Sequence, residues 1–170
     1  MFDVGLRDEL LRRMQCDQQV RLSLPKNGPV PDDLMEEWRR VDTDNTAYLN
    51  QVIDEYGWPG HDLVEEEGAH AAWLLAQHAD HDLDFQRRCL TLLQDAVDRG
   101  QAAPSNLAYL VDRVRVNEGR PQVYGTQYYA PDGVFQPRPI EDRERLDERR
   151  AGAGLGPHAD YDSSMRQQYG

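Results

Sequence analysis

The sequence predicts a mainly α-helical protein with a short β-hairpin near its C-terminal end. Apolar side chains recur every three or four residues up to about residue 118, which is the spacing of a helix face packed on a core. Beyond Gly119 the sequence becomes rich in Val, Tyr, Phe and Thr on both sides of the turn signal Pro131-Asp132-Gly133. The expected architecture is a single domain of about five helices with a C-terminal β-hairpin, a short helix and an irregular tail.

Five helices account for the first part of the chain in this prediction. All but the third stop at a glycine or a proline, residues that interrupt helices. Pro25, Pro29 and Pro31 exclude a helix from the loop KNGPVP between the first two. The expected helices span residues 6–24, 32–56, 63–79, 84–99 and 104–119.

The hairpin is expected near residues 122–140. Its strands would lie in QVYGTQYYA and VFQPRPI, and Pro137 and Pro139 would confine the second strand to a sheet edge. A short charged helix, EDRERLDERRA, follows. Residues 1–150 are therefore expected to form a helical domain with the hairpin. Residues 151–170 form a glycine-rich polar tail that is either draped over the domain or partly disordered.

Composition and charge restrict the possible partners. The chain has 170 residues, of which 39% are hydrophobic and 29% charged, as in an ordinary soluble domain. A formal net charge of -12 argues against non-specific binding to nucleic acid or to anionic membranes, since both need a positive field. An anionic small-molecule substrate stays compatible, because one buried arginine can set the local sign. The sequence carries no indication of the oligomeric state.

Cysteine usage and the N-terminal segment indicate a cytoplasmic protein. Cys16 and Cys89 have no metal-ligand spacing, and both lie in helical patterns where buried free thiols are expected. The N-terminal segment MFDVGLRDELLRRM is charged throughout and lacks the apolar centre of a signal peptide. No apolar run approaches the length that spans a bilayer.

The most informative segment is GAHAAWLLAQHADHDLDFQ, residues 68–86. Its apolar first half predicts a helix buried on most sides, yet its end carries a dense set of proton-handling side chains. His78, one turn after the apolar residues, could act as a general acid or base near neutral pH, particularly with a carboxylate orienting its ring. The alternative is a histidine at a helix end, bonded to a backbone carbonyl. The polar residues are Gln77, His78, Asp80, His81 and Asp82.

A metal site is a second interpretation of the same helix. Glu66 and His70 are four residues apart and His78 and His81 three, so all four would lie near one line of an unbroken helix. Glutamate and histidine bind zinc, manganese or iron. No cofactor is predicted, and a divalent metal at these residues is the alternative. The neighbouring Asp80 or Asp82 is more simply an N-cap of the fourth helix.

Polar residues also lie on or beside the apolar faces of other predicted helices. Asn45 lies on the apolar stripe of the second helix, and Asp42 lies one turn beyond Trp38. The Asp112-Arg113 pair borders the stripe of the fifth helix, where the arginine could clamp a carboxylate or phosphate, or form an ion pair on the helix flank. Asp17 and Arg21, one turn apart, could simply pair with each other.

Several short motifs occur in order along the chain. They are DQxxR (Asp17, Gln18, Arg21), DxxN (Asp42, Asn45), GWP (residues 57–59), QH (Gln77, His78), Gln86, DR (Asp112, Arg113) and GxxQxYGTQ (residues 119–127). The ordered set resembles a bacterial family designated domain of unknown function 6624. The resemblance covers about residues 10 to 140, and His70, His81 and the tail are not part of it. It implies a common site without implying a reaction.

We expect these polar residues to converge on one pocket covered by the hairpin. The predicted function is a small-molecule enzyme of hydrolase, lyase or cyclase type in specialised metabolism, with His78 as general acid or base. The alternatives are a non-catalytic acidic binding or immunity-type protein and a metal-dependent enzyme using His78 and His81. The candidate catalytic residues are His78, Asp42 and Asp112. The candidate substrate-binding residues are Asn45, Gln77, Gln86, Arg113, Tyr124, Gln127, Asp17 and Arg21.

Overall fold

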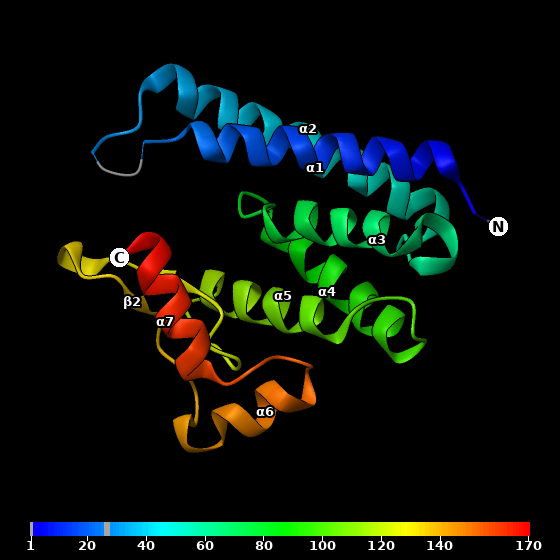
Figure 1. Ribbon diagram of the computed structural model, residues 1–170. Coiled ribbons are helices and arrows are strands. Elements are labelled where there is room, and N and C mark those ends of the chain that lie inside the picture. Colours follow the sequence, from blue (N-terminus) through cyan, green and yellow to red (C-terminus); the bar gives the residue numbers. More distant parts are fainter. Residues whose placement is uncertain (1, 26–27) are drawn as a thin grey trace. The chain divides into compact units, whose positions relative to one another are not determined.

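The computed structural model describes residues 2–25 and 28–170 (Figure 1). These residues contain seven α-helices and one two-stranded antiparallel hairpin, so the mainly α class is confirmed. The chain divides into two compact units, Met1–Ala103 and Pro104–Gly170. The division at residue 150, suggested by composition, stays a prediction.

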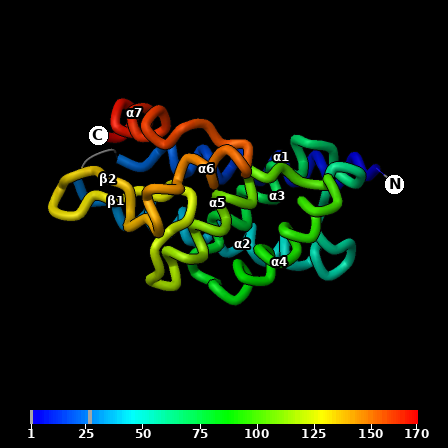
Figure 2. The backbone as a smooth tube through the Cα atoms, turned by 90° about the horizontal axis from the view of Figure 1, so that it is seen from below, coloured from blue at the N-terminus to red at the C-terminus, as the bar shows by residue number. Residues whose placement is uncertain are grey.

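The first unit consists of four helices. They are α1 (Val4–Ser23), α2 (Asp32–Tyr56), α3 (His61–Gln77) and α4 (Leu83–Asp98). Helix α1 packs along α3 and also against α2, and α1 and α3 lie side by side in Figures 1 and 2. Their apolar stripes meet in a closed core, in which Leu10, Leu49 and Leu93 have no exposed surface.

Helix ends in the first unit follow local capping chemistry. Asp3 caps α1 by accepting a hydrogen bond from the Leu6 amide at 2.9 Å. Asp82 caps α4 in the same way through the Phe85 amide, so the N-cap expected at Asp80 or Asp82 is Asp82. Of the loop expected at residues 26–31, residues 26 and 27 lie outside the described part.

Both cysteines are free thiols, and burial raises the pKa of Cys89 to about 12.

Helix α3 ends two residues earlier than predicted, and His78 is its C-cap residue. The cause is Gln86 on α4, which is completely buried. Its side-chain amide donates to the carbonyl oxygens of Ala76 and Gln77, both at 3.2 Å. The Ala76 carbonyl also accepts from the Ala79 amide at 3.2 Å, so a side chain from the next helix and a tight backbone turn together close α3 and fix the segment that carries His78.

The second unit begins with α5 (Pro104–Asn117). The hairpin follows, with β1 (Tyr128–Tyr129) paired to β2 (Gln136–Pro137) around a 3-10 turn at Pro131–Gly133. Each strand has two residues, far shorter than the predicted segments. Before β1, Gln122 forms an isolated bridge with Ile140, but the amides of Val123, Tyr124 and Thr126 donate to a side chain of α5 and are not free to extend the ladder.

The C-terminal segment is helical, whereas an irregular tail was expected. A 3-10 turn at Arg143–Arg145 leads into α6 (Leu146–Gly152), and α7 (His158–Tyr169) follows. Tyr161 on α7 packs edge-on against Tyr109 and Tyr128, and its hydroxyl donates to the Thr126 carbonyl at 3.1 Å. These contacts give a polar sequence the tertiary packing that its composition does not indicate.

No helix in residues 2–25 and 28–170 combines the length and the apolar character needed to cross a bilayer.

Candidate functional site

The centre of the candidate site is a pair between His78 and Asp17. The His78 Nδ1 atom lies 3.0 and 2.9 Å from the two carboxylate oxygens of Asp17, a residue of α1 with no exposed surface. An ionised carboxylate only accepts hydrogen bonds, so Nδ1 carries the proton and donates it. Within residues 2–25 and 28–170 the Nε2 atom makes no hydrogen bond, and the side chain stays 15% exposed.

Arg21 extends this pair into a network of four side chains. Its guanidinium lies 3.0 Å from Asp17, one turn earlier on α1, and donates three hydrogen bonds of 3.1–3.2 Å to the carboxylate of Asp42 on α2. The amide of Gln18 also donates to Asp17, at 2.9 Å. A buried carboxylate is costly unless it is paired, and here three donors offset that cost. We refer to Asp17, Arg21, Asp42 and His78 as the acid–base network.

The partners differ in detail from those predicted. Asp42 was expected to orient His78, but the structure gives that position to Asp17 and places Asp42 against Arg21. The signal for Asp17 was present in the sequence, because it follows Leu6 and Leu10 on the apolar face of α1. A polar residue on an apolar helix face indicates a buried polar contact, and this applies to Asp17 as it does to Asn45.

A cleft of about 470 Å³ opens beside the network. One wall is the face of α2 that carries Met35, Trp38 and Asp42, and the other is the turn between α3 and α4, with Asp80 and His81. The Arg21 guanidinium lies over the Trp38 ring at 5.4 Å from its centroid. The volume falls within the range of small-molecule sites, and the cleft shares Asp42 with the network.

The other candidates of the first unit have structural contacts. Asn45 accepts a hydrogen bond from Arg13 at 3.1 Å, and in the described residues its side chain makes no hydrogen bond with the network. Gln86 caps α3 and also donates to Asp80 at 3.2 Å. Gln77 is buried, and its backbone carbonyl is one of the groups capped by Gln86.

The geometry assumed for the metal alternative is not present. That interpretation needed one unbroken helix through Glu66, His70, His78 and His81, whereas α3 ends at Gln77. His70 packs its ring against Trp73, and His78 directs Nδ1 to Asp17. In the described residues, no group of three or more His, Cys, Asp or Glu side chains is placed to hold a metal ion.

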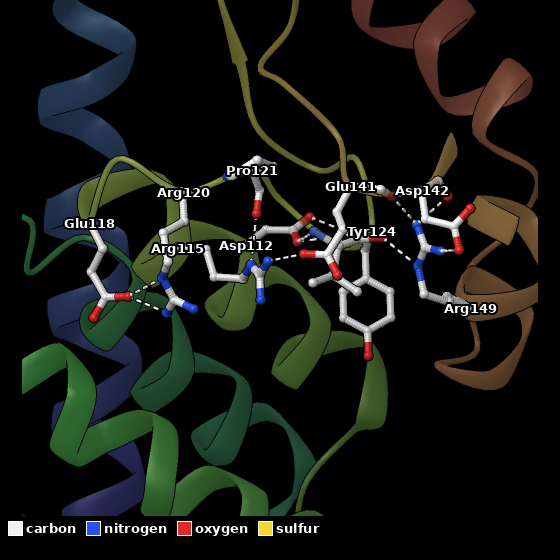
Figure 3. Close-up of polar contacts among 10 residues, drawn as sticks. Asp112, Arg115, Glu118, Arg120, Pro121, Tyr124, Glu141, Asp142 and Arg149 are labelled. Atoms are coloured by element: carbon white, nitrogen blue, oxygen red, sulfur yellow. Dashed lines mark hydrogen bonds and ion pairs between the residues drawn. The ribbon is translucent and has the colours of Figure 1, made fainter. Parts of the chain in front are cut away.

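Asp112 belongs to the second unit and organises its loop. Its completely buried carboxylate accepts hydrogen bonds from the backbone amides of Val123, Tyr124 and Thr126 at 2.7–2.9 Å, and from the Thr126 hydroxyl at 2.8 Å. Figure 3 shows Asp112 beside Tyr124. Neighbouring Arg115 fixes the same loop through the Pro121 carbonyl at 2.7 Å. These bonds use the acceptor positions of the Asp112 carboxylate and favour a structural role for it.

Residues of the GxxQxYGTQ motif form hydrogen bonds with one another in this loop. The Gln122 side chain bonds to both the backbone amide and the carbonyl of Gln127, at 2.8 and 2.9 Å. Gln127 in turn accepts a hydrogen bond from Arg113 at 2.9 Å. The Tyr124 carbonyl accepts one from buried Arg150 at 2.7 Å. The residues proposed here for substrate binding, Arg113, Tyr124 and Gln127, therefore all contribute to loop architecture.

Comparison with known protein families assigns the chain to a family. Residues 4–170 match the model of a family described as a family of unknown function, DUF6624. No curated protein and no solved structure matches the chain significantly. Because the matched region covers nearly the whole sequence, the chain belongs to the DUF6624 family.

Proposed function

We propose that this protein is a small-molecule enzyme, of hydrolase, lyase or cyclase type, that uses His78 as general acid or base. The observation that carries the proposal is the pairing of His78 Nδ1 with the fully buried Asp17 carboxylate. This pairing fixes the ring orientation and leaves Nε2 to accept or deliver a proton. It is the arrangement by which a buried carboxylate supports a catalytic histidine on several unrelated folds.

Arg21 and Asp42 would support the imidazolium form that appears during turnover. When Nε2 takes a proton, the new positive charge lies next to the negative charge of Asp17. Arg21 cannot leave Asp17 easily, because it is also held by Asp42. The network therefore keeps its charges in place while the histidine changes its protonation state.

The proposed setting is cytoplasmic, with a role in specialised metabolism. The two free cysteines support a reducing compartment. No cofactor takes part in the proposed proton transfer.

Replacing His78 tests the proposal. His78→Gln should reduce turnover roughly 10²–10⁴-fold, the usual contribution of a general base. Purified wild-type protein and variant would be incubated with a small-molecule extract of bacterial cells, and substrate consumption followed by mass spectrometry. His61→Gln is the control, since no side-chain hydrogen bond of His61 occurs in the described residues and its backbone amide bonds to Gln101. Full turnover in a folded His78→Gln protein would refute the assignment.

The alternative of an acidic interaction protein is supported by the net charge of -12. Under this alternative His78→Gln lowers the stability and no compound in the extract is consumed by the wild-type protein. Recovery of one basic protein at equal molar amount would favour it.

A further inference from the structure

The cleft beside the network has an imbalance between donors and acceptors. Its two carboxylates already have partners: Asp42 accepts from Arg21, and Asp80 accepts from Gln86. Its donors are not used in this way. The side chains of Arg39 and Thr43, both on the cleft wall, make no hydrogen bond or ion pair with residues 2–25 and 28–170. A bound molecule that satisfies this site must supply acceptor atoms.

Arg39 is distinguished from the adjacent arginine by its lack of a partner. Arg40 donates from Nε and from a terminal nitrogen to the carboxylate of Glu37, both at 2.8 Å, one turn earlier on α2. Arg39 is exposed and lines the cleft, and Arg40 does not line it. The guanidinium of Arg39 is therefore available for a planar anionic group such as a carboxylate.

The rest of the cleft suits an apolar body. Met35 and the ring of Trp38 form its wall, and most of the exposed lining is apolar. The Trp38 Nε1 atom is buried and has no hydrogen-bond partner in the described residues, which is a further donor that an acceptor atom could satisfy. His81 completes the opposite side.

We propose that this cleft binds a small organic acid, with its apolar part against Met35 and Trp38 and its carboxylate on Arg39. As a statement of substrate class this rests on the function proposed above, because the cleft shares Asp42 with the acid–base network. The residue expected to anchor an anion was Arg113, which bonds to Gln127 in the second unit. Arg39 takes that role for the first unit.

Three compounds with one scaffold and different charge test the proposal: phenylpropanoate, phenylpropanol and phenylpropylamine. Binding to the full chain would be measured by calorimetry, and the site located by the NMR signal of the Trp38 indole. Phenylpropanoate should bind about tenfold or more tighter than the other two, the usual effect of a charge-assisted hydrogen bond. Arg39→Gln should abolish this preference, and Arg40→Gln, with the same change of charge on the adjacent residue, should retain it.

The proposal is overturned if the amine or the alcohol binds as tightly as the acid, or if neither the heat nor the Trp38 signal changes with any of them. It is also overturned if Arg40→Gln weakens binding as much as Arg39→Gln does. The His78→Gln variant separates this result from the proposed function. Retained binding with unchanged turnover would reject the catalytic role of His78 and leave the cleft assignment intact. Loss of turnover in His78→Gln, together with no preference of the wild-type protein for the acid, would support the catalytic role of His78 and reject the cleft assignment.

Discussion

At the scale of single residues, Asp17 decides how the site works. Its position on the apolar face of α1 could be recognised from the sequence, and so could the position of His78 at the end of a buried helix. The pairing between them could not, because 61 residues separate the two and periodicity carries no information about which helices meet. Asp42 was an equally plausible partner until the packing of α1 against α3 was known.

Removing the charge of Asp17 should destabilise the protein. We expect Asp17→Asn to lower the free energy of unfolding by about 3 kcal/mol, since it leaves Arg21 and His78 without their buried counter-charge. Chemical denaturation followed by circular dichroism measures this change. Asp44→Asn is the matched control: Asp44 also pairs with an arginine, Arg13, but is 62% exposed, so about 1 kcal/mol or less should be lost. Equal losses in the two variants would contradict the account of Asp17.

At the scale of elements, the helices followed from the sequence and their connections did not. The predicted starts and ends of all five helices agree with α1 to α5 within about two residues, because caps, prolines and glycines are local signals. The details that differ depend on distant side chains. Gln86 closes α3 early, and Asp112 captures the amides that were expected to form a strand. Neither effect leaves a pattern that sequence periodicity can detect.

Asp112 tests whether the loop motif is structural. Asp112→Asn places an amide nitrogen where a carboxylate oxygen receives backbone amides, so at least one charge-assisted hydrogen bond is lost. We expect the free energy of unfolding to fall by about 1.5–3 kcal/mol, and amide exchange at Val123, Tyr124 and Thr126 to accelerate. Asp132→Asn, at an exposed left-handed turn position that asparagine tolerates, should change neither. Unchanged exchange in Asp112→Asn would favour the catalytic role originally predicted for Asp112.

The stability of helix α7 should fall at acid pH because of His158. Burial, with a contribution from the charge of Arg150, lowers the pKa of His158, although Asp162 and the Gly125 carbonyl act in the opposite sense. The unfolded chain therefore binds this proton more readily than the folded one. The stabilisation is complete above about pH 6.5, the ordinary histidine value, and is lost as the pH falls through the lower folded pKa.

Amide exchange of α7 between pH 7.5 and pH 5 tests this expectation. In the wild-type protein the exchange of α7, corrected for its intrinsic pH dependence, should accelerate on acidification. In His158→Gln, which cannot take up the proton, that response should be much smaller. If both proteins respond alike, the acid response belongs to other groups such as Asp162, whose pKa is lowered mainly by its hydrogen bond to Arg166.

At the scale of the whole molecule, the sequence predicted the fold class. Alternating apolar stripes and turns were enough for a mainly α chain with a hairpin. The boundary expected at residue 150 rests on a change of composition and stays a prediction, whereas the compact units Met1–Ala103 and Pro104–Gly170 rest on contacts in the folded chain. The acid–base network and the adjacent cleft lie entirely in the first unit. The family motifs thus include two structural groups, one around His78 and one around Asp112.

The most direct test of the central claim is which ring nitrogen of the neutral His78 side chain carries the proton, measured by nitrogen-15 NMR. The account predicts that the proton lies on Nδ1, because Nδ1 is the ring nitrogen that lies against the Asp17 carboxylate. In Asp17→Asn this fixed preference should be lost. A neutral His78 that carries its proton on Nε2 in the wild-type protein would contradict the proposed acid–base site.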